Sequence, residues 1–232
     1  MSDFINIKLS MNTMDKFFIR NAIFKALNAS VDDFSGEFLD VGCGKMPYKT
    51  FILDNSKVEN YTGLDIDGAI VYDERVKPDF TWDGRVMPFE DNSFDSVMAT
   101  EVLEHCPDPT IVLKEIVRVL KPGGKLFFTV PFIWNLHEVP YDEYRYTPFA
   151  LERLMHEAGF NSVDIRATGG WHASMAQMLG LWLIRSDMSV NIRRVLKVVS
   201  LPLYKLLLKL DAPPESFKET TMVPSLYGNC TV

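Results

Sequence analysis

The sequence predicts an α/β fold in which helices cover both faces of an open, mostly parallel sheet. Three observations predict it: strand-like runs alternate with helical ones, a glycine-rich turn follows the first run, and carboxylates end the next two. With 232 residues, 47% of them apolar and 24% charged, the chain can bury a sizeable core. We therefore expect one domain over residues 1–232 and exclude disordered and coiled-coil classes.

The strands are predicted from short apolar runs between helical segments. An N-terminal helical region covers residues 12–35, and its helix over 12–28 has one apolar face after the capping residues Asn12 and Thr13. Residue 36 begins a core that extends to 168, and a closing strand is expected within 222–232. The strands of the core are 37–41, 61–64, 79–82, 93–100, 125–130 and 162–167.

Two helices of the core are predicted from their ends. Asp108 and Thr147 are N-cap residues, and each is followed by proline, which fits the first turn of a helix. The glycine pair at 123–124 follows the first helix, and Gly159 ends the second, where a left-handed residue is required. Both helices carry apolar residues at helical spacing, so each should cover the sheet.

Residues 169–221 interrupt the alternation and are predicted to be a helical insertion. Between 181 and 210 six basic residues face only Asp187, a local charge of +5. The whole chain carries −7, so the remainder carries −7 − 5 = −12. The stretch 171–210 fits a lid over the acceptor, a homodimer contact, a helix on an anionic membrane, or plain core packing.

Charge and cysteine content restrict the partners and the compartment. Because Lys and Arg number 24 against 31 Asp and Glu, we expect no nucleic-acid partner. The three cysteines form no CxxC pair and have no histidine at ligand spacing, which favours a reducing compartment and no metal site. No secretory signal is visible, and the uncharged stretch 167–184 is too polar for a membrane span, so a cytoplasmic location is expected.

The segment GEFLDVGCG, residues 36–44, indicates a nucleotide-type site. A strand that runs directly into Gly42-Cys43-Gly44 leaves main-chain N–H groups open to a ligand. A dinucleotide fingerprint would need a third glycine near position 47, where Pro47 stands, so nicotinamide binding is disfavoured. An ordinary tight turn would give the same short pattern.

Carboxylates at the ends of the next two strands strengthen the nucleotide interpretation. Asp65 follows Gly44 by 21 residues, the position at which a carboxylate accepts hydrogen bonds from both ribose hydroxyls in a doubly wound fold. Asp83 ends the third strand, where an acid could accept a hydrogen bond from an adenine amino group.

Four motifs in this order resemble the class I S-adenosylmethionine-dependent methyltransferases, in particular the type 11 branch typified by ubiquinone and menaquinone methyltransferases. The resemblance implies a Rossmann-like, seven-stranded class I methyltransferase fold with an antiparallel last strand, and S-adenosylmethionine as cofactor. The motifs are LDVGCG (39–44), GLDID (63–67), WDGRVMPFEDNSFDSVMATEVLEH (82–105) and EIVRVLKPGGKLFFTVP (115–131).

The resemblance also implies roles for the residues in the first two motifs. Asp40, Gly42 and Gly44 would cradle the methionine part of the cofactor. Asp65 would hold the ribose, and Ile66 would lie against the adenine. A structural role for Asp40 as a cap of the following helix is the alternative.

Four further residues complete the implied cofactor site. Asp83 and the backbone of Gly84 would bind the adenine amine, while Glu101 and Val102 would line the sulfonium side. The chemistry agrees, because these carboxylates would attract a sulfonium cation and repel a pyrophosphate. His105 lies in a segment common across the family and is interpreted as a positioning residue.

The loop at 131–148 is the expected acceptor site, because ligands of an open parallel sheet lie beyond the carboxyl ends of its strands. Its aromatic, acidic and basic side chains suit a polyhydroxylated molecule, although a loop that merely covers the cofactor is the alternative. The predicted acceptor-binding residues, with one from the segment after the next strand, are Trp134, Tyr141, Asp142, Tyr144, Arg145 and Trp171.

Two histidines are candidates for a catalytic base. Methyl transfer mainly needs alignment and desolvation, and only a hydroxyl acceptor has to lose a proton. His137 in the acceptor loop is the first choice, and His172, after a glycine pair, is the second. A structural role is the alternative for each.

The acceptor itself is predicted only as a class. The pattern H-x3-Y-D-x2-R-Y-T over 137–147 resembles bacterial methyltransferases associated with polysaccharide, lipopolysaccharide or other glycan synthesis. The expected function is methyl transfer to an oxygen of a small molecule, with a saccharide as the favoured acceptor. The alternatives are N- or C-methylation of another metabolite and an inactive cofactor-binding scaffold.

Overall fold

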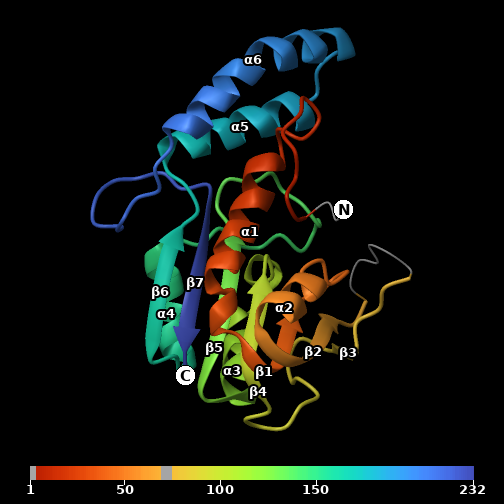
Figure 1. The fold of residues 1–232 in the computed structure, drawn as a ribbon, viewed down its shortest axis with the longest axis vertical. Coiled ribbons are helices and arrows are strands. Elements are labelled where there is room, and N and C mark those ends of the chain that lie inside the picture. The colour runs from red at the N-terminus through yellow and green to blue at the C-terminus, as the bar shows by residue number, and fades with distance from the viewer. Residues whose placement is uncertain (1–3, 69–74) are drawn as a thin grey trace.

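The computed structural model describes residues 4–68 and 75–232, and its centre is a seven-stranded sheet (Figure 1). The strand order is β3-β2-β1-β4-β5-β7-β6, with β7 antiparallel to both neighbours and the other pairs parallel. This is the predicted sheet, including its antiparallel last strand. The bounds are β1 Ser35–Val41, β2 Lys57–Ile66, β3 Phe80–Trp82, β4 Phe94–Thr100, β5 Leu120–Pro131, β6 Ser162–Ala167 and β7 Ser225–Thr231.

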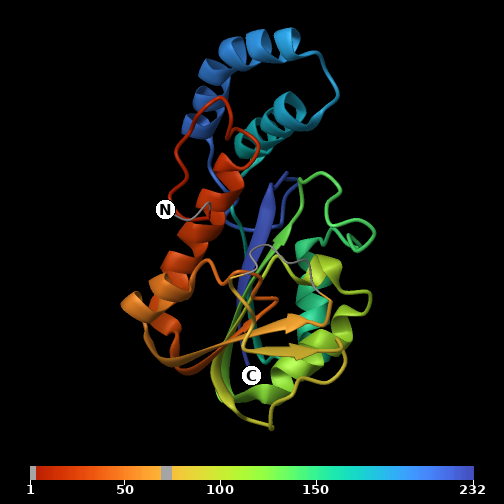
Figure 2. The ribbon, with the colours of Figure 1, turned by 90° about the vertical axis from the view of Figure 1, so that its right-hand side faces the viewer.

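Helices cover both faces of the sheet, as Figure 2 shows with the sheet nearly edge-on. Helices α1 and α2 lie on one face, and α3 and α4 lie on the other. The bounds are α1 Phe17–Ser30, α2 Lys49–Asn55, α3 Pro109–Val119, α4 Pro148–Ala158, α5 Trp171–Arg185 and α6 Val190–Leu210.

The alternation of side chains along each central strand divides the apolar residues between two cores. Phe38 on β1 and Phe127 on β5 pack with α1 and α2, whereas their neighbours Leu39 and Leu126 pack with α3 and α4. All four side chains are buried. Because successive residues of a strand point to opposite faces, an unbroken apolar run is what a sheet covered on both sides requires.

The predicted helix ends are confirmed for α3 and α4. The backbone N–H of Thr110 donates to the Asp108 carboxylate, and that of Ala150 donates to the Thr147 hydroxyl. Gly159 ends α4 with a φ of 118°. The start of α1 was predicted too early, because the Thr13 hydroxyl accepts from the N–H of Ser10 and holds a separate turn before the helix.

The insertion consists of α5 and α6, a helical hairpin that projects beyond the carboxyl ends of the parallel strands (Figures 1 and 2). Arg185 pairs with the carboxylate of Asp15, and the carboxylate of Asp211 accepts from the N–H of Gly170 and of Ala173. Tyr204 anchors a small third core against the segment before α1. Among the described residues, no helix is both long and apolar enough to cross a membrane.

Candidate active site

A hollow lies at the carboxyl ends of β1 and β4, where the sequence predicts the cofactor. Its floor contains the turn 42–44 and Glu101, and its walls come from α1 and from the loop after β5. His137 lines the hollow from that loop, and Arg20 lines it from α1. The topology therefore brings the predicted glycine turn and the first-choice base to one place.

The glycine turn adopts a backbone that few other residues would tolerate. Gly42 and Gly44 have φ values of 67° and 50°, in the left-handed region that favours glycine. A Cβ on Gly42 would lie 2.5 Å from Cγ2 of Val102. The N–H groups of Gly42 and Cys43 donate to the carbonyl of Leu64, which ties the turn to β2, and that of Gly44 donates to Asp65. The prediction that these N–H groups are open to a ligand is therefore wrong, and the turn offers a ligand close approach because its glycines have no side chains.

Asp65 links the end of β2 to the same turn. Its Oδ2 accepts from the N–H of Gly44 and its Oδ1 from the N–H of Ile66, each at 2.9 Å. Burial raises the pKa of this carboxyl above its usual value, and the two backbone hydrogen bonds oppose the rise. A Cβ on Gly84 would lie 3.4 Å from the Ile66 side chain, so the ends of β2 and β3 meet here.

Asp83 is exposed at the end of β3. Its carboxylate accepts hydrogen bonds from the N–H groups of Arg85 and Val86, and these bonds lower its pKa. The side chain thus shapes the turn after β3 in this structure, while its exposed position leaves oxygen lone pairs open to a ligand.

The side chain of Asp40, which the resemblance places at the cofactor, does not line the hollow. It is buried, and the hydroxyl of Tyr61 on β2 donates to its carboxylate. Burial raises the pKa of Asp40 to about 7, although the hydrogen bond from Tyr61 opposes the rise. The side chain joins β1 to β2 inside the fold.

Glu101 lines the hollow directly after β4 and has an unusual backbone. Its φ is 56°, a value that is uncommon for a residue with a side chain. The Thr129 hydroxyl donates to its Oε1 at 2.8 Å, and its own N–H donates to the Thr129 carbonyl. Burial raises its pKa. Strain of this kind is typical of functional positions.

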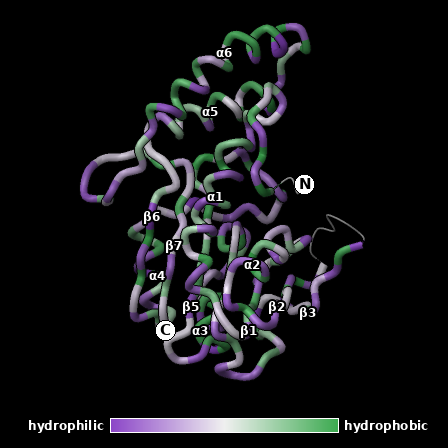
Figure 3. Tube along the Cα trace, in the orientation of Figure 1, coloured by the Kyte–Doolittle hydropathy of each residue, from purple (hydrophilic) through white to green (hydrophobic). Residues whose placement is uncertain are grey.

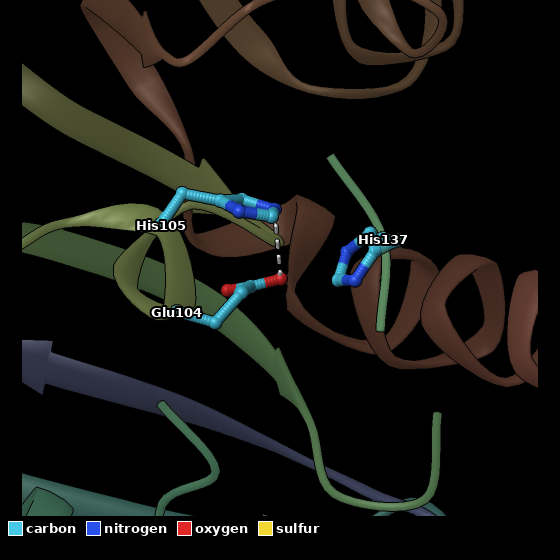
Figure 4. Close-up of side chains that lie close together, drawn as sticks. All are labelled: Glu104, His105 and His137. Carbon is cyan, nitrogen blue, oxygen red and sulfur yellow. Dashed lines mark ion pairs between the residues drawn. The ribbon is translucent and has the colours of Figure 1, made fainter. Parts of the chain in front are cut away.

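His105, Glu104 and His137 turn their side chains toward one another, as Figure 4 shows. The imidazole centroids of His105 and His137 are 4.7 Å apart. Nδ1 of His105 lies 3.0 Å from the carbonyl of Tyr141, and Nδ1 of His137 lies 3.1 Å from the Asp142 carboxylate. Carbonyl and carboxylate oxygens only accept, so the Nδ1 atom of each ring carries a proton.

Asp142 holds the His137 ring in this orientation. The guanidinium of Arg145 donates to both oxygens of Asp142, at 2.6 and 2.8 Å, and the N–H of His137 donates to Oδ2. These donors keep the pKa of Asp142 well below its usual range. Burial lowers the pKa of His137, so the ring is neutral at pH 7.

The same cluster contains a buried carboxylate without a hydrogen-bond donor. Glu104 is fully buried, and in the described part of the chain neither carboxylate oxygen has a hydrogen-bond partner. Burial raises its pKa well above the usual value, and Nε2 of His105 is the nearest charged partner, at 3.8 Å from its Oε1 (Figure 4). Ligand atoms of Glu104, His105 and His137 lie within 4.8 Å of one another, a donor set that could hold a divalent cation. The sequence spacing had not predicted this set.

A second hollow adjoins the first and shares Trp134 with it. Its lining includes Asp142, Tyr144 and Arg145, so four of the six predicted acceptor residues lie together. Tyr141 contributes its carbonyl to His105, while its side chain is 62% exposed.

The structure does not bring the second-choice base to either hollow. His172 and Trp171 begin α5, and both are exposed and absent from both linings. The glycine pair before α5 does not direct them into the site, because Asp211 fixes Gly170 and starts the projecting hairpin there.

Sequence reasoning missed the wall of the hollow formed by the N-terminal region. Arg20 lies over the ring of Phe4 at 4.0 Å, and Nζ of Lys45 lies 4.9 Å from the same ring. Both cations line the hollow, which is therefore mixed in charge rather than purely acidic. An arginine between the apolar residues of the first helix was the available signal.

Residues 39–128 match the family described as a methyltransferase domain. Over 115 residues, 44% of this chain, the sequence is 35% identical to a ubiquinone biosynthesis O-methyltransferase of Xanthomonas oryzae pv. oryzae, covering 46% of that protein. A demethylmenaquinone methyltransferase of Staphylococcus haemolyticus is 33% identical over 123 residues, 40% of this chain and 52% of its own. The chain thus matches about half the length of these relatives.

Solved structures confirm the fold. A Thermotoga maritima protein described as an S-adenosylmethionine-dependent methyltransferase, possible histamine N-methyltransferase, superposes with a TM-score of 0.55. The alignment covers 90% of this chain and 88% of that one at 16% identity. The sheet with its antiparallel β7 is the class I methyltransferase fold.

Proposed function

We propose that this protein transfers a methyl group from S-adenosylmethionine to an oxygen of a small-molecule acceptor. One observation carries the proposal: His137, oriented by Asp142, lines the same hollow as the glycine turn and Glu101. The site thus combines a glycine turn without side chains, which a cofactor can approach closely, with a neutral imidazole that can take a proton from a hydroxyl.

The charges around the hollow suit S-adenosylmethionine, which carries a sulfonium, an ammonium and a carboxylate group. Glu101 would face the cationic part, and Arg20 and Lys45 would face the carboxylate. Asp65, fixed by two backbone donors, would accept the ribose hydroxyls. Ile66, which is 49% exposed, and Gly84 would bracket the adenine, with Asp83 at its amino group; these assignments follow the resemblance.

His137 would act as the general base. Its Nδ1 proton is held by Asp142, so the lone pair of Nε2 is free to accept the acceptor's hydroxyl proton as the oxygen attacks the methyl carbon. Arg145 keeps Asp142 ionised, and the negative charge of Asp142 stabilises the imidazolium that forms.

The second hollow would bind the acceptor. Trp134 and Tyr144 offer flat faces and Glu143 offers a carboxylate, a combination that suits a sugar ring, as the glycan resemblance also implies. The O-methyltransferase relative, named for ubiquinone biosynthesis, favours an aromatic hydroxyl as a second candidate.

Calorimetric titration with S-adenosylmethionine and with NAD tests the cofactor. We expect binding of the first alone, and Asp65→Ala should weaken it by about 1–3 kcal/mol because ribose hydroxyls lose their acceptor. Asp67→Ala, which changes the acid two residues after Asp65, is the matched control. NAD binding, or an unchanged affinity in Asp65→Ala, would contradict the assignment. Release of S-adenosylhomocysteine with saccharide and catechol acceptors then identifies the acceptor class.

A further inference from the structure

We propose that the α5–α6 hairpin docks this protein onto an anionic lipid surface. Two exposed apolar stripes and a concentration of basic side chains share this one projecting unit. The inference concerns where the protein binds and does not depend on the proposed methyl transfer.

Helix α6 carries an apolar stripe on the side that faces solvent. Its members recur at intervals of three or four residues, which places them on one line along a helix, and each is at least 50% exposed. They lie opposite Tyr204, the buried residue through which α6 packs on the rest of the protein. The stripe consists of Ile192, Val195, Val199, Leu203, Leu206 and Leu210.

Helix α5 presents a second stripe of exposed apolar residues. Trp171, Met175, Met178 and Trp182 are spaced by four, three and four residues, and all are at least 50% exposed. Tryptophan has an apolar ring and a polar N–H, so it is suited to the boundary between lipid headgroups and acyl chains. Figure 3 shows apolar residues along both helices of the hairpin, interrupted by polar ones on α6.

The charges of the hairpin favour an anionic surface over a second copy of this chain. Helix α6 contains five basic residues and no acidic one. An isologous dimer through this face would bring two such helices together, whereas anionic headgroups would neutralise them. The remainder of the chain outside 181–210 carries −12, so repulsion from the same lipids would keep it turned away.

The position of the hairpin agrees with this role. It projects beyond the carboxyl ends of the parallel strands, the end of the sheet at which the hollow lies (Figures 1 and 2). The long basic side chains Lys205 and Lys209 can extend to headgroups while the neighbouring apolar stripe enters the acyl region. No helix needs to span the bilayer for this mode of binding.

Vesicle co-sedimentation of the full chain tests the proposal. We expect binding to phosphatidylglycerol vesicles, little binding to phosphatidylcholine vesicles, and loss of binding at high salt. Val199→Asp with Leu206→Asp should reduce the bound fraction at least tenfold, and Lys205→Glu with Lys209→Glu should do the same. Because Val199 and Leu206 are exposed, the variants should fold normally.

Matched variants elsewhere give the controls. Phe149→Asp changes an apolar residue that is 64% exposed on α4, and Lys114→Glu reverses an exposed charge on α3; both should bind as the wild type does. Tryptophan fluorescence should shift to the blue on adding phosphatidylglycerol vesicles, and Trp171→Ala with Trp182→Ala should remove the shift.

Two results would overturn the proposal. One is the absence of sedimentation with either vesicle, or equal sedimentation of the wild type and the stripe variants. The other is a wild-type dimer by light scattering that Val199→Asp with Leu206→Asp converts to a monomer, because a second copy would then cover the stripes. Calorimetry with S-adenosylmethionine on the same variants reports separately on the proposed function.

Discussion

At the scale of single residues, Asp40 shows how burial governs an acid. Its carboxyl has a pKa of about 7 in the folded protein, against 3.8 without perturbation. The folded state therefore binds the proton more tightly than the unfolded state. The contribution of Asp40 to the free energy of unfolding is therefore largest below about pH 4 and is lost as the pH rises through 7.

This linkage predicts that Asp40→Asn removes part of the pH dependence of folding. The amide oxygen can still accept a hydrogen bond from the Tyr61 hydroxyl, but the amide does not ionise. Between pH 4 and pH 8 the free energy of unfolding of the variant should therefore rise by several kcal/mol relative to that of the wild type. Urea unfolding at a series of pH values measures the difference. Asp54→Asn, at an exposed position of α2, is the control. Parallel curves of unfolding free energy against pH for Asp40→Asn and the wild type would refute the linkage.

His137 and His172 form a natural pair for testing the base. His137→Ala should reduce kcat by about 10²- to 10⁴-fold and leave the affinity for S-adenosylmethionine unchanged, because only proton removal is lost. His172→Ala should have wild-type activity, since the residue is exposed on α5. Equal activity of both variants would remove His137 from catalysis.

The pH profile gives a second readout for the same residue. Burial lowers the pKa of His137 below 6.5, and the base is active only when neutral. The midpoint of the acid limb of the wild-type rate should therefore lie below pH 6.5, the pKa of an unperturbed imidazole. Asp142→Asn removes a charge that raises the pKa, so the acid limb should shift to still lower pH. If the acid limb of the Asp142→Asn profile stayed at the wild-type pH, Asp142 would not set the pKa of the catalytic base.

At the scale of elements, the turn after β1 combines two constraints on Gly42. Its positive φ disfavours any side chain by about 1–2 kcal/mol, and a Cβ would also press on Val102 at 2.5 Å. Gly123 has a similar φ of 79°, and a Cβ added there would meet nothing within 4 Å, which makes this glycine the matched control.

We predict that Gly42→Ala lowers stability by about 1–3 kcal/mol more than Gly123→Ala, in thermal or urea unfolding. The second substitution Val102→Ala should recover part of this difference, because it removes the Cγ2 atom that the new methyl group meets. If the two glycine variants lost the same stability, or if Val102→Ala recovered none of it, the close approach to Val102 would not contribute to the cost of Gly42→Ala.

Elements with a local signal were predictable from the sequence. Asp108 and Thr147 cap helices through side-chain hydrogen bonds to residues at most three positions away, so a local sequence pattern predicts their role. Central strands follow from apolar runs that supply both cores at once. Thr13 misled the prediction because its hydroxyl closes a turn with Ser10 instead of capping the helix.

The site was predictable only where it follows a strand end. Gly42, Asp65 and Glu101 occupy such ends, and the topology brings them together. Asp40 depends on Tyr61, which is 21 residues away on the neighbouring strand, and no local pattern reports that contact. Arg20 reaches the hollow only because α1 packs across the sheet, which is a tertiary effect.

At the scale of the whole molecule, the sheet and the hairpin differ in how they are held. The sheet has an extensive apolar core on each face, whereas α6 buries only Tyr204 among its 21 residues. Segments with few buried apolar contacts open more easily than core strands. Helix α5 buries seven residues, so the weakly held part of the hairpin is α6, which should unfold locally at a lower free energy than the sheet.

Tyr204→Ala tests this division, because the side chain is fully buried and its hydroxyl donates to the Met14 carbonyl at 3.0 Å. Losing a buried aromatic ring costs about 3–5 kcal/mol. We expect faster hydrogen exchange in α6 and in the turn before α1, with protection of β1, β4 and β5 unchanged. Leu126→Ala, inside β5, should instead weaken protection across the sheet. If Tyr204→Ala raised exchange equally in α6 and in the sheet, the two would form one cooperative unit, and α6 could not open without the end of the sheet that carries the hollow.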